Sequence, residues 1–334
     1  MNPNDGTRRL PALRPLACGV MLALTALPVS SLMARELDNV SETIDENAPV
    51  EDWNLKNAAE LIVNNGSTNV IMAANTSKVS LNNATVTRIN PMGAQHALEL
   101  RDDTTATANG TSFVNGGILL QGNASAVLTN SSITMDANTP GMGDGSFFAY
   151  GISINSPGAL GNPNIVLDNS TVTVADNPNA GHYGRSIGAA VRAGGIEMRN
   201  GSRIDSANVG VLLHALSELK DSLRVSLDGS HIHAGLNAGI EIAAGTDDNT
   251  YDILVANGST IKGGDGNLLL VRAYNGVTTN GDHTVNFTVD NSQLDGNITV
   301  DDTDMTGNNS VNVVLRNNAS ILGRFTKVTR TDIS

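Results

Sequence analysis

The sequence predicts an all-β fold, a right-handed parallel β-helix (solenoid) of about ten rungs, on the order of 45–50 Å long. Three observations predict it. One short motif recurs along the 334 residues, and the segments between its copies are short apolar strands without the spacing of helices. Aromatic residues make up only 3% of the chain, so the core must consist of Val, Ile and Leu, which suit pleated, half-buried surfaces.

The recurring motif reads apolar-x-apolar-x-[Asn/Gly]-small-(x)-x-apolar, which is a short strand, a turn and a second short strand. Asn and Gly suit the turn because both adopt left-handed backbone conformations at low cost. We expect Val225, Leu227 and Ile232 to point inward, as do their equivalents in other copies (Ile165, Leu167, Val172; Val79, Leu81, Val86). The clearest copies are "VSLNNATVT" (79–87), "AVLTNSSIT" (126–134), "IVLDNSTVT" (165–173), "VSLDGSHIH" (225–233) and "FTVDNSQLD" (287–295).

A second family of segments lies between these copies. Each is a short apolar strand, usually opened by Gly or Asn: "GILLQG" (117–122), "GAAVRAG" (188–194), "VGVLLHA" (209–215), "AGIEIAAG" (238–245) and "NLLLVRAYNG" (267–276). The unit of strand, turn, strand, spacer and strand repeats every roughly 20–35 residues. This period leaves no room for the long crossover helices of a βαβ sheet. Because equivalent strands recur in the same order, direct stacking of the copies is favoured over a sandwich or barrel.

The N-terminal region, residues 1–34, is expected to be a secretion signal peptide. Three arginines within the first 14 residues precede an apolar stretch (16–29) that is short for a membrane span. Cleavage after Ser31 and cleavage after Ala34 both fit the small-residue rule. Cys18 is the only cysteine, so the mature chain has none, and packing and hydrogen-bond ladders must stabilise it.

The stretch at 50–87, "VEDWNLKNAAELIVNNGSTNVIMAANTSKVSLNNATVT", combines a lead-in Trp, an "L-x-V-x-N-G-S" turn and a "V-x-L-x-N-A-x-V" strand. In these features, and in its lack of cysteine, the mature chain resembles the passenger domains of Gram-negative autotransporters (type V secretion), pertactin-like ones in particular. The resemblance implies a lead-in or cap at 35–60 and a β-helix passenger at 61–334.

The same resemblance implies export through the inner membrane and a place at the cell surface or in the medium. Members of the family end in a translocator barrel, whereas this sequence stops at "RFTKVTRTDIS". The passenger is therefore expected to be truncated and to meet a membrane only through the missing barrel. A periplasmic location is expected if the barrel is truly absent.

Charge and motif spacing exclude several activities. The chain has 33 acidic and 20 basic residues, a net charge of −13, which argues against nucleic-acid binding because phosphates require clustered Lys and Arg. The family that the chain resembles includes serine proteases with a "GDSGS" nucleophile motif, but "GDGSFF" (143–148) lacks that order of residues. Asp168, Asp228 and Asp290 share one outward position, which other copies fill with Thr or Arg, so they form a solvated ladder rather than a catalytic carboxylate pair.

The pair of histidines in "VSLDGSHIH" is the clearest candidate for a metal site. Because the apolar residues of this copy point inward, His231 and His233 are expected to point outward. Neighbouring copies supply no Cys, His or carboxylate trio to complete a tetrahedral site, which leaves adventitious metal binding as the alternative. No catalytic, cofactor-binding or metal-ligating residue is predicted, and no cofactor is expected.

The longest insertions between the repeats, 136–164, 175–187 and 272–283, hold most of the aromatic residues. Loops on rigid scaffolds carry function, and aromatic side chains are favoured contact anchors. The alternative is that Phe147 and Phe148 only pin their loop against the β-helix. The candidate binding residues are Phe147, Phe148, Tyr150, His182, Tyr183 and Tyr274.

These observations predict a secreted or surface-exposed passenger that acts as an adhesin or virulence-type binding protein and is not an enzyme. The expected partner is a host-cell surface or matrix component, or a second copy of the chain. The alternatives are a β-helical polysaccharide-active enzyme (a lyase or glycosidase) and a purely structural stalk.

Overall fold

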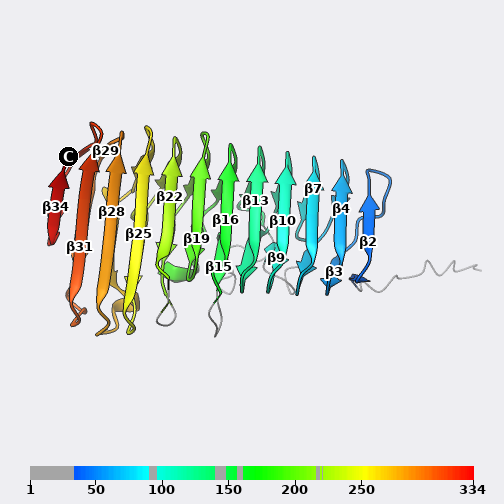
Figure 1. The fold of residues 1–334 in the computed structure, drawn as a ribbon, viewed down its shortest axis with the longest axis horizontal. Helices are drawn as coiled ribbons and strands as arrows, with labels where there is room; N and C mark the ends of the chain where they lie inside the picture. Colours follow the sequence, from blue (N-terminus) through cyan, green and yellow to red (C-terminus); the bar gives the residue numbers. More distant parts are fainter. Residues whose placement is uncertain (1–33, 90–95, 140–147, 156–160, 216–218, 220) are drawn as a thin grey trace, which may run out of the picture. The chain divides into compact units, whose positions relative to one another are not determined.

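Parallel strands stacked side by side make up the described part of the chain (Figure 1). The computed structural model describes residues 34–89, 96–139, 148–155, 161–215, 219 and 221–334. Of the predicted features, Phe147 and all of the signal peptide except Ala34 lie outside these residues. Residues Ala34–Ser334 form one compact unit. No helix in the described ranges is long and apolar enough to cross a membrane.

Two long sheets, each of twelve strands, run through the stack. Sheet A consists of β1 (Arg35–Asp38), β3 (Trp53–Lys56), β6 (Ile71–Ala73), β9 (His96–Leu100), β12 (Gly117–Gln121), β15 (Tyr150–Asn155), β18 (Ile187–Val191), β21 (Val209–Leu213), β24 (Ile240–Ala244), β27 (Asn267–Ala273), β30 (Asn297–Asp301) and β33 (Phe325–Thr326). Sheet B consists of β2 (Ser41–Ile44), β4 (Glu60–Asn64), β7 (Lys78–Asn82), β10 (Thr105–Asn109), β13 (Ser125–Thr129), β16 (Asn164–Asp168), β19 (Gly195–Arg199), β22 (Leu223–Asp228), β25 (Asn249–Ala256), β28 (His283–Asp290), β31 (Asn309–Arg316) and β34 (Arg330–Ile333).

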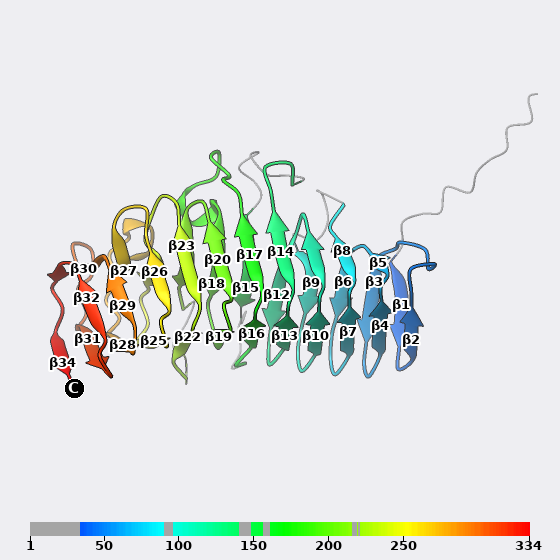
Figure 2. The same ribbon diagram turned by 90° about the horizontal axis from the view of Figure 1, so that it is seen from above.

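The shorter strands of each repeat form a third sheet and a separate pair. Sheet C consists of β5 (Ser67–Thr68), β8 (Thr85–Thr87), β11 (Ser112–Val114), β14 (Ser132–Met135), β17 (Thr171–Val174), β20 (Arg203–Ser206), β23 (His231–Ala234) and β26 (Thr260–Lys262). The pair is β29 (Gln293–Asp295) with β32 (Ser320–Leu322). Two short 3₁₀ helices, η1 (His182–Gly184) and η2 (Tyr274–Gly276), follow β17 and β27. Figure 2 shows the strands of sheets B, C and A recurring in the same order, for example β13, β14 and β15 and then β16, β17 and β18.

The predicted fold class is confirmed, because the strand ladders are parallel and each strand pairs with its counterpart in the next repeat. The long sheets have twelve strands, whereas about ten rungs were predicted. Residues 35–60, expected to be a lead-in, supply β1, β2 and β3, already paired into the two sheets, and β33 and β34 extend the sheets at the C-terminal end. The right-handed sense of the coil stays a prediction.

The motif residues occupy the predicted faces of the strands. Val225, Leu227 and Ile232 are at most 1% exposed, and their equivalents in the other copies named above are buried too. The turn asparagines adopt positive φ, as at Asn130 (50°) and Asn169 (48°). The Asn169 side-chain amide donates to the Asn130 side-chain oxygen at 2.6 Å, so the turns also form a ladder. The fold therefore follows from a short sequence pattern that recurs in each repeat.

The small residue after each turn asparagine forms a second, buried ladder. The backbone N–H of Ser131 donates to the hydroxyl of Ser170 at 3.0 Å, and the backbone N–H of Ser170 donates to the hydroxyl of Ser202 at 3.1 Å. Each hydroxyl thus accepts a hydrogen bond from a buried backbone N–H of the neighbouring repeat. Without that partner, the buried N–H would cost free energy. This accounts for the preference of the motif for Ser at that position.

The histidine pair lies on β23 and faces outward. His233 Nδ1 lies 3.3 Å from an Asp205 carboxylate oxygen, and His231 Nδ1 lies 2.9 Å from the hydroxyl of Thr260. Over the described ranges, no group of three or more His, Cys, Asp and Glu side chains is arranged to hold a metal ion. The pair therefore makes ordinary side-chain contacts with the neighbouring strands.

Candidate functional site

The outer face of sheet A changes character along the stack. Its middle column of outward side chains, one from each successive strand, reads Glu99, Leu119, Ser153, Ala190, Leu212, Glu241, Leu270 and Thr299. The strands β18, β21 and β24 are buried at every position, inward and outward alike. Strands buried on both faces must have a layer on each side. The central part of this outer face is therefore covered.

The cover consists of η1 and η2, which we call the roof. Tyr183 of η1 and Tyr274 of η2 pack on an apolar cluster separate from the main core. The sheet residues of that cluster are Tyr150, Ile187, Ala190, Val209, Leu212 and Ala243, contributed by β15, β18, β21 and β24. Insertions from two distant parts of the chain thus meet over one face of the sheet.

A stack of three rings attaches the roof to the sheet. The Tyr274 ring lies between Tyr183, with ring centroids 4.6 Å apart and planes at 24°, and His214, at 4.0 Å and 9°. His214 Nδ1 lies 2.9 Å from the carbonyl oxygen of Ala243, which orients the imidazole. Burial lowers the pKa of His214, so the ring at the base of the stack is neutral at neutral pH. A flat, neutral ring suits face-to-face contact with tyrosine.

A fully buried carboxylate ties the roof to the sheet beside this stack. Glu241 is 0% exposed, and its two oxygens lie 3.0 Å from His182 Nε2 and 2.9 Å from Arg272 Nε. Burial alone would raise the pKa of Glu241, but His182 and Arg272 together hold it below its ordinary value. Burial, together with the Glu241 charge, raises the pKa of Tyr183. The buried carboxylate thus pairs with Arg272 of the sheet and contacts His182 of the roof.

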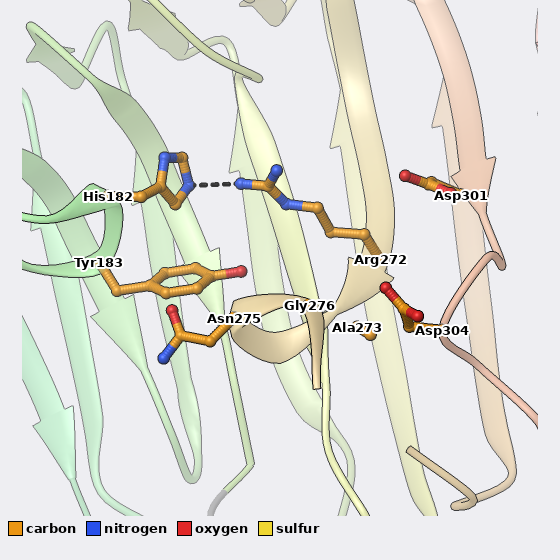
Figure 3. A pocket seen from close by; sticks show the side chains of 8 residues that line it. All are labelled: His182, Tyr183, Arg272, Ala273, Asn275, Gly276, Asp301 and Asp304. Carbon is orange, nitrogen blue, oxygen red and sulfur yellow. Dashed lines mark hydrogen bonds between the residues drawn. The ribbon is translucent and has the colours of Figure 1, made fainter. Parts of the chain in front are cut away.

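Two hollows flank the roof. The first, which we call the acidic pocket, has a volume of about 290 Å³ and lies beside His182 and Arg272 (Figure 3). In Figure 3 the Arg272 guanidinium extends toward His182 and away from Asp301 and Asp304. Because Glu241 already pairs with Arg272, the two aspartates give this pocket its negative character.

The second hollow, which we call the arginine pocket, is larger, at about 410 Å³, and has the opposite character. It shares His182, Tyr183 and Asn275 with the acidic pocket. None of its described lining residues is an Asp or a Glu. Its other lining residues are His96, Leu119, Gln121, Phe148, Tyr150, Ser153, Asn155, Ala180, Gly181, Gly184, Arg192 and Tyr274.

The structure brings together the described residues that the sequence singles out. Phe148 stacks near Tyr150, with ring centroids 5.8 Å apart and planes at 25°, and the Tyr150 hydroxyl donates to the Tyr183 carbonyl oxygen. Tyr150 and Tyr183 are buried, so they hold the roof in place. Phe148 is 51% exposed at the arginine pocket, where it is free to contact a partner. Tyr150 and Tyr183 thus anchor the roof, and the contact role expected of Phe148 stays a prediction.

Sequence reasoning missed three charged residues near the roof, which are Arg192, Glu241 and Arg272. Each follows or lies within a strand of the second family, such as "AGIEIAAG" (238–245), whose outward positions are largely apolar. A signal was present in the sequence, because a strand that is apolar on both faces is covered on both sides. A single charged residue on such a strand is therefore expected to be buried and paired with an ion of opposite charge. The partners of each charge, however, come from distant segments.

Compared with protein-family models, curated proteins and solved structures, the chain matches none. The parallel β-helix is accordingly established by the pairing of its strands, and the function has to be inferred from the chemistry of the outer face of sheet A.

Proposed function

We propose that this chain is an exported β-helical binding protein, an adhesin-type passenger of the autotransporter class, that contacts its partner with the outer face of sheet A. The carrying observation is that aromatic residues from three insertions gather over one face of the scaffold. Phe148, His182 and Tyr274 all line the arginine pocket there. The proposed partner is a host-cell surface or matrix component, and the proposed location is the cell surface or the medium.

The scaffold suits such a role because its ladders fix the positions of the loops. Backbone pairing, asparagine side chains and buried serine hydroxyls all connect one repeat to the next. Binding residues carried on a rigid scaffold lose little conformational freedom when a partner arrives. An exposed aromatic beside buried, ordered ones is the arrangement found at contact hot spots.

The autotransporter assignment is supported by the parallel repeats and by the N-terminal end of the stack. Trp53, the lead-in tryptophan of the resemblance, is fully buried in β3, and the Arg35 guanidinium carbon lies 4.9 Å from the centre of its ring. The first repeats are thus anchored by an aromatic core residue. A stalk would need the same ladders, but it would not need a roof over one face of sheet A.

A polysaccharide-active enzyme is the second candidate, favoured by the carboxylates around the acidic pocket. A glycosidase needs a protonated carboxylic acid as the proton donor, which requires a raised pKa. His182 and Arg272 lower the pKa of Glu241, and hydrogen bonds from Thr303 lower that of Asp301. These carboxylates therefore suit pairing and positioning better than proton donation.

The test is the binding of the full chain to cultured host cells and immobilised matrix proteins. Phe148→Ala removes an exposed ring from the arginine pocket, and we expect it to weaken binding by roughly tenfold with an unchanged melting temperature. The matched control, Val127→Ala, removes an exposed apolar side chain from sheet B and should leave binding unchanged.

Equal binding by both variants would contradict the proposed surface. Binding to neither cells nor matrix, with self-association unchanged by Phe148→Ala, would favour the stalk. Release of reducing or unsaturated sugar ends from a polysaccharide panel would establish the enzyme instead.

A further inference from the structure

Arg192 is a partly buried cation for which the described residues supply no counter-ion. It follows β18 and lines the arginine pocket, and in the described part of the chain no carboxylate lies within ion-pair distance of it. Among the described residues, its guanidinium makes one hydrogen bond, a long one of 3.4 Å from an Nη atom to the Tyr150 hydroxyl, and its buried Nε has no partner. By contrast, Arg101, Arg185 and Arg272 each pair with a carboxylate. An under-bonded, partly buried guanidinium costs free energy unless something binds it.

The surroundings of Arg192 define the chemistry of what would bind there. The guanidinium carbon lies 5.6 Å from the centre of the Tyr150 ring, and Phe148 presents its exposed ring beside Tyr150. Asn155 also lines the pocket, and its side-chain oxygen is buried without a hydrogen-bond partner. The pocket thus combines a cation, an amide able to pair with hydroxyl groups and a flat apolar surface. It lacks described carboxylates, although the whole chain carries a net charge of −13.

We infer that the arginine pocket binds a carboxylated sugar, a uronic-acid-type pyranose of a glycan, with the carboxylate on Arg192 and a ring face against Phe148. The inference rests on the proposed function and names the ligand class of that same surface. The planar guanidinium matches a carboxylate in two parallel hydrogen bonds, and Asn155 serves the ring hydroxyls once its side chain turns toward them. The pocket volume of about 410 Å³ suits one or two sugar rings.

The neighbouring strand supplies an independent reporter of carboxylate binding. The backbone N–H of His214 donates to the carbonyl of Val191, which places His214, the residue after β21, beside Arg192, the residue after β18. Burial is the main cause that lowers the pKa of His214, and the positive charge of Arg192 lowers it further. A carboxylate on Arg192 would offset that charge, so the pKa of His214 should rise when the acidic sugar binds.

The experiment titrates the full chain with glucuronic and galacturonic acid and with their neutral parents, glucose and galactose, by calorimetry and by NMR of the histidine side chains. We expect each uronate to bind about tenfold more tightly than its neutral parent. Only the uronates should raise the pKa of His214. Equal affinity for acidic and neutral sugars would overturn the inference, as would equally tight binding of acetate or inorganic phosphate, which would indicate a simple anion site.

Substitutions distinguish the contribution of the Arg192 guanidinium to sugar binding from that of the aromatic surface. Arg192→Gln should reduce the preference for uronates to within about twofold, and Arg192→Lys, which keeps the charge but not the fork, should retain part of it. Phe148→Ala should weaken acidic and neutral sugars alike. The matched control, Arg199→Gln, removes an arginine from an exposed ion pair with Asp168 on sheet B and should change nothing. An unchanged preference in both Arg192 variants would contradict the inference.

The two proposals fail in different ways. If uronates do not bind but Phe148→Ala still abolishes attachment to cells, the ligand class is wrong and the binding surface stands. If uronates bind as expected but Phe148→Ala leaves attachment unchanged, the pocket binds a sugar and the proposed function is wrong.

Discussion

The outer faces of sheets A and B are built by the same repeats, yet their charged side chains lie in different surroundings, as Asp168 on sheet B and Glu241 on sheet A show. On sheet B, Asp168 pairs with Arg199 at 3.0 Å and accepts from Asn200 at 2.8 Å, and the arrangement recurs at Asp290 with its own Arg and Asn neighbours. On sheet A, Glu241 pairs with Arg272 and contacts the His182 imidazole beneath the roof, and it is fully buried.

This difference shows where a solenoid can carry function. Sheet B repeats one exposed pattern, so its side chains are interchangeable and screened by solvent. Sheet A departs from repetition, because insertions cover it and create pockets of opposite charge on the two sides of the roof. A site for one ligand requires such a departure from the repeated pattern, because a uniform ladder would present the same surface to the ligand at every rung.

Removal of the buried carboxylate should give the largest effect. Glu241→Ala leaves Arg272 and His182 without their shared partner, and we expect it to lower the free energy of unfolding by about 3–5 kcal/mol. The matched change on sheet B, Asp168→Asn, breaks an exposed pair and should be nearly silent. Urea denaturation followed by circular dichroism measures both. Equal effects would show that the two faces do not differ in the way described.

The turn shared by all rungs should be sensitive to backbone conformation rather than to contacts. Asn169 has a φ of 48°, so Asn169→Ala should cost about 1–2 kcal/mol in unfolding free energy through left-handed strain. Asn169→Gly removes the same ladder hydrogen bond without that strain and should cost less. Thermal unfolding of the two variants tests the order. A larger loss for Gly than for Ala would mean that the side-chain ladder, not the conformation, dominates.

The smallest expected effect is a pH dependence of the ring stack. Burial holds the pKa of His214 below its ordinary value of 6.5, so the unfolded chain takes up that proton first as the pH falls. The contribution of the neutral His214 ring to the free energy of unfolding is therefore present above about pH 6.5 and is lost as the pH falls below it. His214→Phe keeps a flat ring but cannot titrate, so its stability should fall less than that of the wild type between about pH 6.5 and 5. Parallel pH profiles would contradict the buried, neutral ring.

How much the sequence can predict follows from the range of each interaction. The inward faces of Val225, Leu227 and Ile232 were predictable because strand alternation is a local property. The partners of Glu241 were not, since His182 lies 59 residues and Arg272 lies 31 residues away. They meet only because sheet register and two insertions bring them together. Loop aromatics could be identified as candidates, but their division into anchors and contacts depends on packing.

Hydrogen exchange of the full chain, with and without the proposed cellular or matrix partner, tests the central claim most directly. Because the proposed surface is the outer face of sheet A, binding should protect backbone amides around η1 and η2 and at the edges of the arginine pocket. Amides of β13, β16 and β19 in sheet B should exchange as in the free chain. Protection confined to sheet B, or spread evenly over the repeats, would contradict the account.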